Sequence, residues 1–152
     1  IRHGFHALAR EETRNSYTPV LWTCPEDWQG HIEQVWFPGT HGDVGGQLGG
    51  FEAARPLANI PLVWMLERME SCGLVCPEDW RARFTQNPRA ASVSTWRGFG
   101  KLFLFRKRRR IETDICERIH HSVYAREQRD PPTLIGGLTV RLKRRWRGAS
   151  SV

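Results

Sequence analysis

The chain has no apolar run approaching the ~20 residues that a transmembrane helix needs, so the sequence predicts no membrane span. Its cysteines lack a zinc pattern, because Cys72 and Cys76 are separated by three residues and no second pair or nearby histidine completes a ligand set. We expect reduced, mostly buried thiols at Cys24, Cys72, Cys76 and Cys116, as in a protein synthesised in the cytoplasm. No P-loop or dinucleotide fingerprint is present, and we expect no cofactor.

The first residue is Ile1 rather than methionine, which indicates a processed chain or a fragment of a longer one. A signal peptide can therefore not be assessed from the sequence. The 152 residues fit one domain, and 39% of them are hydrophobic, which is enough for a core. The sequence leaves the oligomeric state open.

Acidic residues are scarce in the last third of the chain. Residues 1–100 hold nine Lys and Arg against eleven Asp and Glu, whereas residues 101–152 hold fourteen against five. The basic residues are concentrated in 106–110 and 143–147. Such clusters are typical of a solvated basic surface, and they also attract the phosphates of anionic lipid or nucleic acid.

Periodicity and turn residues predict a strand, a glycine-rich loop and a helix in succession. Residues 1–30 are predicted to be a connecting region, and 32–37 a buried strand. The loop covers 42–56, and the helix begins with Asn59 as its N-cap and ends at Gly73. Its apolar face is predicted to comprise Leu62, Met65, Leu66 and Met69.

A second helix is predicted from Asp114, whose pairing with Glu117 resembles a capping box. Pro131-Pro132 would end it. One face of this helix would present Ile115, Ile119 and Val123.

One histidine follows the predicted strand directly. The run 35–46 is an apolar strand that ends at a Pro-Gly break and continues with His41, Asp43 and a glycine pair. A histidine beyond the carboxyl end of a strand is in the usual position of active-site residues in open α/β sheets, and its ordinary pKa suits proton transfer.

Four interpretations of His41 remain open. In the first, it is the general base of a Ser-His-Asp triad, and in the second, it binds a metal together with Asp43. In the third, the glycine loop binds phosphate, and in the fourth, His41 only forms hydrogen bonds with the main chain of its own loop. The metal interpretation lacks a third ligand. The triad interpretation needs a nucleophile in a G-x-S-x-G sequence, and no serine of the chain is flanked in this way.

Two blocks of the sequence resemble a known family. The first contains Arg2-His3, His6-Ala7-Leu8-Ala9, Glu12, Arg14, Tyr17, Pro19 and Leu21-Trp22. The second runs from Glu33 to Gly46 and is followed by Ile60, Leu62, Trp64, Met65 and Gly73-Leu74. A weaker similarity involves Arg118-Ile119-His120, Ser122-Val123 and Arg126. Together they resemble the type VI secretion phospholipase effector-like catalytic domain family, whose members are α/β-hydrolase-related bacterial proteins.

The resemblance implies a Ser-Asp-His esterase or phospholipase in which His41 is the catalytic histidine. Asp43, Gly45 and Gly46 would shape its loop. The nucleophile and the triad aspartate would lie N-terminal to this chain, so the chain alone would be inactive. The chain departs from the family pattern in four places. Arg10 replaces an aliphatic residue, and Glu11 stands where aspartate is usual. Gly42 replaces a common serine, and Gln47-Leu48-Gly49-Gly50 replaces a glycine-tyrosine continuation.

The same resemblance implies the domain organisation and the partners. Residues 1–130 would be the C-terminal portion of an α/β-hydrolase-like fold, and 131–152 a basic, partly disordered tail. The substrate would be an ester or phospholipid, and the basic C-terminal third would contact an anionic membrane surface. Export by a type VI system would follow cytoplasmic synthesis.

Two alternatives accompany this interpretation. His120 or His121 would replace His41 as the catalytic histidine, although both lie in a predicted helix. The rival function is a non-enzymatic module that binds nucleic acid or anionic lipid through its basic clusters. Its stacking partners would be Trp96, Phe99, Phe103, Phe105 and Trp146.

Overall fold

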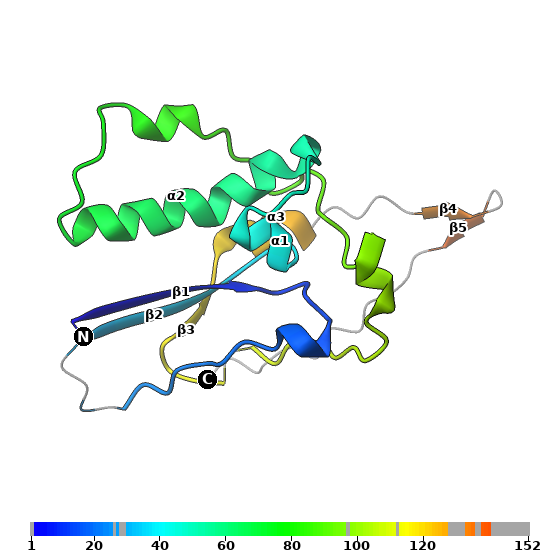
Figure 1. The fold of residues 1–152 in the computed structure, drawn as a ribbon, viewed down its shortest axis with the longest axis horizontal. Helices are drawn as coiled ribbons and strands as arrows, with labels where there is room; N and C mark the ends of the chain where they lie inside the picture. The colour runs from blue at the N-terminus through cyan, green and yellow to red at the C-terminus, as the bar shows by residue number, and fades with distance from the viewer. Residues whose placement is uncertain are drawn as a thin grey trace.

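Parallel strand pairing organises the part of the chain that the structure, a computed structural model, describes (Figure 1). The described residues are 2–127 apart from 26, 28, 29, 97 and 112, together with the backbone of 133–135 and 138–140. In this part, β1 (His3–Ala9), β2 (His31–Phe37) and β3 (Glu117–Ile119) form a parallel sheet with β2 in the middle. The predicted mixed α/β class is confirmed.

The helices connect and cover these strands. They are α1 (His41–Gly45), α2 (Arg55–Ser71) and α3 (His121–Glu127), with 3₁₀ turns at Asn15–Tyr17, Glu52–Ala54, Trp80–Arg83 and Gly98–Leu102. Within the described residues, no helix combines the length and the apolar character needed to cross a membrane.

A second, antiparallel pair is formed by β4 (Thr133–Ile135) and β5 (Leu138–Val140). The basic tail predicted at 131–152 lies outside the described residues apart from the backbone of this pair. The proline pair predicted to end the second helix lies outside them as well.

The three parallel strands end at one common edge. Ala9 lies opposite Phe37 in the β1–β2 pair, and Ile119 lies opposite Trp36 in the β2–β3 pair. The chain segments that follow each strand are therefore neighbours, which is how parallel sheets bring residues from distant parts of a sequence together.

The strand predicted at 32–37 is confirmed as β2, whereas the connecting region predicted over 1–30 is wrong for β1. His3, Gly4 and His6 dilute the apolar signal of β1, so its own sequence gives little indication of a strand. It is specified by its pairing with β2, an example of strand formation that depends on context.

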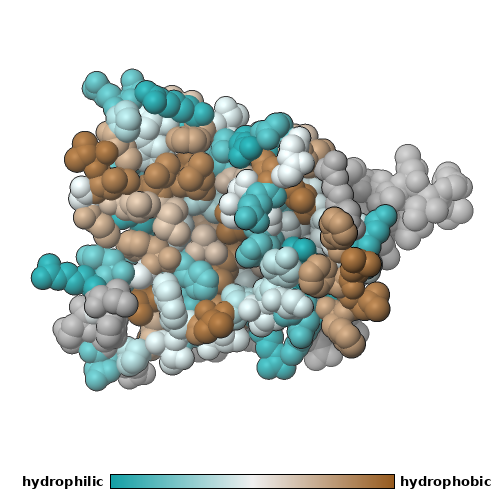
Figure 2. Space-filling view, in the orientation of Figure 1, coloured by the Kyte–Doolittle hydropathy of each residue, from teal (hydrophilic) through white to brown (hydrophobic). Residues whose placement is uncertain are grey.

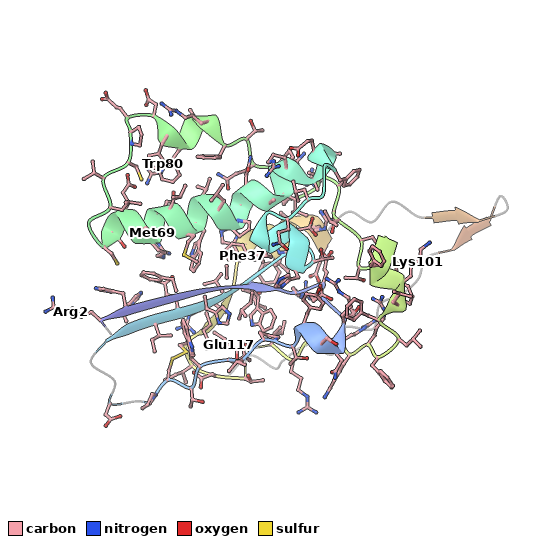
Figure 3. All side chains as sticks on the ribbon, in the orientation of Figure 1. Arg2, Phe37, Met69, Trp80, Lys101 and Glu117 are labelled. Carbon is pink, nitrogen blue, oxygen red and sulfur yellow. A yellow bond between two sulfur atoms is a disulfide. The ribbon has the colours of Figure 1, made fainter. Side chains whose placement is uncertain are left out.

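One face of the sheet packs against α2. Side chains alternate between the two faces of a strand, and Val35 and Phe37 of β2 face this helix. They are buried together with Leu57, Ile60 and Trp64 of α2. Figure 3 shows Phe37 between the sheet and the helices. This cluster is the apolar core beneath the strand ends.

The helix predicted between Asn59 and Gly73 is confirmed as α2, but the predicted first residue and the predicted buried face are wrong. The helix begins at Arg55 rather than after an N-cap at Asn59, so Asn59 and Pro61 both lie in its interior. Leu62 and Met69, expected in the core, are exposed, because apolar residues occur on several sides of α2 and Leu57, Ile60 and Trp64 occupy the buried one.

The predicted C-terminal glycine of this helix is confirmed. Gly73 has a φ of +100°, the left-handed conformation that glycine adopts without a Cβ penalty. Its N–H donates to the Glu70 carbonyl at 2.9 Å, and the Leu74 N–H donates to the Met69 carbonyl at 3.0 Å. These two bonds make a Schellman motif.

The helix predicted from Asp114 is wrong. The segment is a turn, then β3, and then the short helix α3. The Asp114 carboxylate accepts the main-chain N–H groups of Cys24 and Cys116 instead of capping a helix. Strand pairing with β2 thus overrides the helical spacing of Ile115, Ile119 and Val123.

The other face of the sheet, here called the polar face, carries buried polar groups beside the apolar side chains of Leu8 and Trp36 and is covered by irregular segments. The buried Gln34 amide donates to the Trp22 carbonyl at 2.9 Å and accepts the Trp22 N–H at 2.7 Å. The Trp36 indole donates to the Glu117 carboxylate at 2.7 Å. These buried polar groups have partners, as burial requires, whereas the buried Nδ1 of His6 on the same face has none in the described chain.

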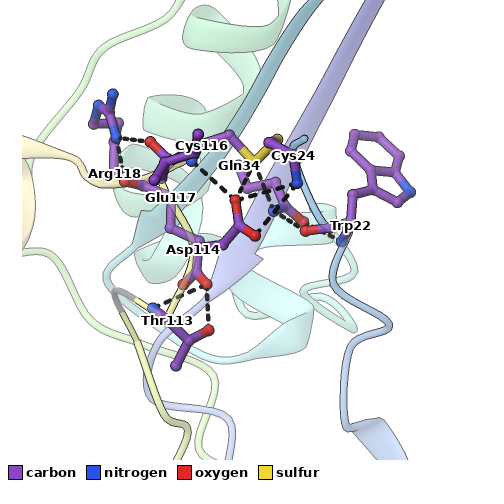
Figure 4. The surroundings of a disulfide bond; sticks show 9 residues. Trp22, Cys24, Gln34, Thr113, Asp114, Cys116, Glu117 and Arg118 are labelled. Atoms are coloured by element: carbon purple, nitrogen blue, oxygen red, sulfur yellow. Dashed lines mark hydrogen bonds between the residues drawn. A yellow bond between two sulfur atoms is a disulfide. The ribbon is translucent and has the colours of Figure 1, made fainter. Parts of the chain in front are cut away.

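A disulfide joins Cys24 to Cys116 on this polar face (Figure 4), which overturns the expectation of four reduced thiols. The two cysteines are 92 residues apart in sequence, and the pairing of β2 with β3 brings them together. Cys72 and Cys76 are free, and Cys72 is exposed rather than buried.

We expect the double substitution Cys24→Ser/Cys116→Ser to lower the free energy of unfolding by about 2–4 kcal/mol, because the cross-link restricts a long loop in the unfolded chain. Urea unfolding followed by circular dichroism measures this. The matched control is Cys72→Ser/Cys76→Ser, which should leave the unfolding midpoint unchanged. Equal midpoints for the oxidised and reduced wild-type chain would argue against the disulfide.

Candidate active site

The segment directly after β2 forms a short helix, although the sequence predicted a loop from residue 42. Helix α1 begins at His41, directly after the N-cap residue Thr40. Asp43 completes a capping box with Thr40, which fixes the first turn of the helix. Gly46 ends it with a φ of +73°, a left-handed conformation that favours glycine.

Asp43 is buried, and both of its carboxylate oxygens accept hydrogen bonds from neighbouring loop residues. One oxygen accepts the Thr40 N–H at 2.7 Å and the Ser92 hydroxyl at 2.5 Å, and the other accepts the Val93 N–H at 2.8 Å. Because both oxygens are engaged in this way, Asp43 holds the loop and is not turned toward His41 as a second metal ligand.

Gly39 and Gly45 differ in what an added side chain would contact. A Cβ at Gly39, which has a φ of +102°, would lie 2.7 Å from the Asp43 Cβ, so this position excludes other residues. A Cβ at Gly45 would meet nothing within 4 Å. Gly45 lies on the wall of a cavity, and the absence of a side chain there leaves room for a ligand.

His41 is exposed at the first position of α1 and lines two cavities. The larger, of about 690 Å³, extends along residues 5–9 of β1, and the other, of about 530 Å³, lies beside Val93 and Phe99. The Tyr17 ring lies 4.9 Å from the imidazole, centroid to centroid. Within the described part of the chain the imidazole has no hydrogen-bond partner, so its nitrogens are available to other groups.

Glu12 belongs to the first family-like block of the sequence, but sequence reasoning gave it no role at the site. It is buried, and its carboxylate accepts the His41 N–H at 3.3 Å and the Arg14 guanidinium at 2.7 Å. Burial alone would raise the pKa of the Glu12 carboxyl, but the hydrogen bonds from Arg14 and His41 outweigh burial and lower it. The carboxylate therefore stays ionised and holds the start of α1. The signal available in the sequence was an acidic residue just beyond β1.

A second acidic residue, Glu11, also follows β1 at this edge of the sheet. The Glu11 N–H donates to the Gly39 carbonyl at 2.9 Å, so the segment after β1 runs beside the His41 loop. The Glu11 side chain is exposed and pairs with Arg126 of α3 at 3.3 Å.

His120 and His121, the alternative catalytic histidines, follow β3 at the same edge instead of lying within a longer helix. The His120 ring packs 4.8 Å from Phe37, and its Nδ1 is hydrogen-bonded to the buried Ser122 hydroxyl at 2.7 Å. Burial, together with His121 and Arg68, lowers the pKa of His120 to about 4. His120 is thus a neutral residue at pH 7 that caps α3 and packs on the core.

Part of the predicted nucleic-acid surface faces inward. Arg109 donates to the main-chain carbonyls of Arg14 and Tyr17 at 2.8 and 2.7 Å. The Phe103 ring lies 5.6 Å from the Tyr17 ring, and so it is not free to stack on bases. Trp146 lies outside the described residues.

One group of potential metal ligands occurs among the described residues, away from His41. The ligand atoms of Cys24, Asp114 and Cys116 lie within 4.8 Å of one another. Both sulfurs are bonded to each other in the structure, and a disulfide sulfur does not offer the thiolate that a metal needs.

The comparison with protein families agrees with the resemblance seen in the sequence. Residues 1–68 match the model of the family described as "T6SS, Phospholipase effector Tle1-like, catalytic domain". The match includes β1, β2, α1 and most of α2, and it confirms the suspected family over these residues. It indicates a phospholipase-type hydrolase. Residues 69–130, which resemble the family only in places, lie outside the match.

The search of curated proteins and the search of solved structures found no match for the chain.

We expect Glu12→Gln to lower the free energy of unfolding at pH 7 by about 1–3 kcal/mol, because it leaves the half-buried Arg14 without its ionised partner. The pKa of Glu12 is lowered on folding, so its contribution is present above the ordinary pKa of about 4.5 and is lost as the pH falls further. The difference between wild type and variant should therefore shrink below that pH.

Urea unfolding at neutral and acidic pH measures both effects. The matched control is Glu52→Gln, which removes an exposed carboxylate from an ion pair with Arg55 and should change stability little. A Glu12→Gln deficit that is the same at both pH values would contradict the role of the carboxylate charge.

Proposed function

We propose that the chain forms part of a serine hydrolase that acts on carboxylic esters such as phospholipids, with His41 as the general base. The setting of His41 supports this most directly: it follows a parallel strand, lines two cavities, and has an imidazole without a hydrogen-bond partner in the described chain. The family match over residues 1–68 supports the substrate class and is consistent with export by a type VI system.

The chemistry proposed for His41 is proton transfer. A serine that lies outside these 152 residues attacks the ester carbonyl while His41 takes the hydroxyl proton. His41 returns that proton to the leaving alcohol, and an acyl-serine remains. Water, deprotonated by His41, then attacks the acyl group and releases the acid and the serine.

The free side of β1 is the proposed position of the segment that carries the nucleophilic serine. Within the described sheet, β1 is one of the two edge strands, and parallel strands are usually buried between neighbours. The cavity of about 690 Å³ extends along residues 5–9 of β1 and includes His41. A segment that packs along β1 would bring its serine to the histidine from this side.

The acid of the triad has two candidate sources. The resemblance places an aspartate upstream of the chain. The topology adds Glu11, because the acid precedes the histidine in hydrolases of this kind and Glu11 leaves β1 beside Gly39 of the His41 loop. Its carboxylate now pairs with Arg126 rather than with the imidazole.

In a protein that joins residues 1–152 to the serine-bearing segment, we expect His41→Ala to lower kcat for p-nitrophenyl esters by about 10⁴-fold or more, because the base is lost. His121→Ala, at an exposed position of the same edge, is the matched control and should retain most of the turnover. The 152-residue chain alone should be inactive. Robust turnover by the chain alone, abolished by His41→Ala, would show that the serine lies within it.

The source of the acid is decided by Glu11→Gln in the same active protein. If the acid lies upstream, this variant should keep kcat within about threefold, since removing an exposed ion pair has only a small effect. A loss of about 10⁴-fold, comparable to that from loss of a triad acid, would assign the role to Glu11. Glu127→Gln, which removes a neighbouring carboxylate on α3, is the control.

A non-enzymatic nucleic-acid-binding module remains the rival proposal. It requires steeply salt-dependent binding that His41→Ala does not change. The inward orientation of Arg109 and Phe103 leaves it with fewer of its expected contacts.

A further inference from the structure

The segment 96–105 exposes an unusual number of large apolar side chains. The exposed fractions of Phe99, Leu104 and Phe105 are 85%, 81% and 84%, and those of Leu102 and Trp96 are 74% and 58%. Figure 2 shows apolar side chains gathered at the end of the molecule where the turn Gly98–Leu102 lies. Contiguous exposed apolar groups of this kind mark an interaction site. We refer to 96–105 as the apolar loop.

The apolar loop is held from within by one arginine. The Arg106 guanidinium donates to the carbonyls of Thr95 and Gly100 at 3.1 and 2.7 Å. It also lies 3.6 Å from the centroid of the Trp96 ring and donates to the Phe103 carbonyl. These contacts hold the loop in a shape that presents Phe99, Leu102, Leu104 and Phe105 outward, while Phe103 packs against Tyr17.

Basic residues lie within the apolar loop and directly after it, and this stretch of sequence has no acidic residue. Lys101 lies within it, and Lys107, Arg108 and Arg110 follow it, all of them exposed. Within the described residues none of these four forms an ion pair, and the sequence has no Asp or Glu from 95 to 111. The surface therefore combines insertable apolar groups with unpaired positive charge.

We propose that the apolar loop and its flanking basic residues dock on an anionic phospholipid bilayer. Aromatic and leucine side chains enter the boundary between headgroups and acyl chains, while lysine and arginine contact the lipid phosphates. Leu102 and Leu104 favour a bilayer over nucleic acid, because leucine has no aromatic face on which bases stack. The density of positive charge favours an anionic bilayer over an apolar protein surface.

This surface adjoins the candidate active site. Phe99 lines the cavity of about 530 Å³ that also includes His41. Tyr17 connects the two, with its ring 4.9 Å from the His41 ring and 5.6 Å from the Phe103 ring. Docking would thus set the mouth of the His41 cavity against the lipid headgroups. Bilayer binding is measured without turnover, so the proposal does not rest on the proposed hydrolase activity.

Vesicle flotation with the 152-residue chain tests the docking surface. We expect binding to phosphatidylcholine vesicles that contain phosphatidylglycerol, and much weaker binding to phosphatidylcholine alone. Phe99→Ser/Phe105→Ser should weaken binding by about tenfold or more, because two inserted aromatic rings are lost. The matched control is Val75→Ser, which removes another exposed apolar side chain outside the loop and should bind as wild type.

The basic residues are tested separately. Lys107→Gln/Arg108→Gln/Arg110→Gln should also weaken binding to the anionic vesicles by about tenfold or more, and added salt should weaken wild-type binding. Circular dichroism and a non-reducing gel establish that each variant is folded and that its disulfide is formed.

Three results would overturn the proposal. They are the absence of vesicle binding by the folded wild type, equal binding to both kinds of vesicle, and binding that the Phe99→Ser/Phe105→Ser change leaves intact. A dimer in sedimentation velocity that this change dissociates, without vesicle binding, would assign the loop to self-association instead. His41-dependent turnover of soluble esters without vesicle binding would remove the docking surface and leave the hydrolase proposal in place.

Discussion

The site depends on the parallel pairing of β1 with β2. Because Ala9 lies opposite Phe37, the chain leaves both strands at the same height, and the two exits are bonded to each other through the main chain. Glu12 thereby lies beneath the start of α1, where its ionised carboxylate holds the His41 N–H. Neither strand supplies this arrangement alone, since the histidine follows one strand and its buried support follows the other.

The sequence predicts the elements whose signals are local. The strand at 32–37 is short, apolar and bounded by turn residues. The left-handed conformation of Gly73 depends only on its immediate neighbours in sequence, so the end of α2 could be predicted as well. The contribution of Glu12 could not be predicted in the same way, because it requires the register of β1, a strand with two histidines and a glycine. The disulfide is equally non-local, since it joins segments that meet only through the pairing of β2 with β3.

Composition also conceals how basic and aromatic residues are divided between interior and surface. In 106–110 the side chains of Arg106 and Arg109 turn inward and bind main-chain carbonyls, while those between and after them remain exposed. Among the aromatic residues, Phe103 packs inward against Tyr17, whereas its neighbours in the apolar loop face solvent. A sequence shows the charge and the apolar content of this region but not which side chains hold it together and which are presented outward.

The bond between Cys24 and Cys116 closes a covalent ring that contains β2, α1, α2 and the apolar loop. A protease that cuts the largely exposed segment 74–79 leaves both pieces of the chain joined. A cut between Glu12 and Cys24 has a different result, because β1 and Glu12 are then retained by strand pairing and hydrogen bonds alone. His41 is thus held in the molecule covalently, whereas the carboxylate that supports it is not.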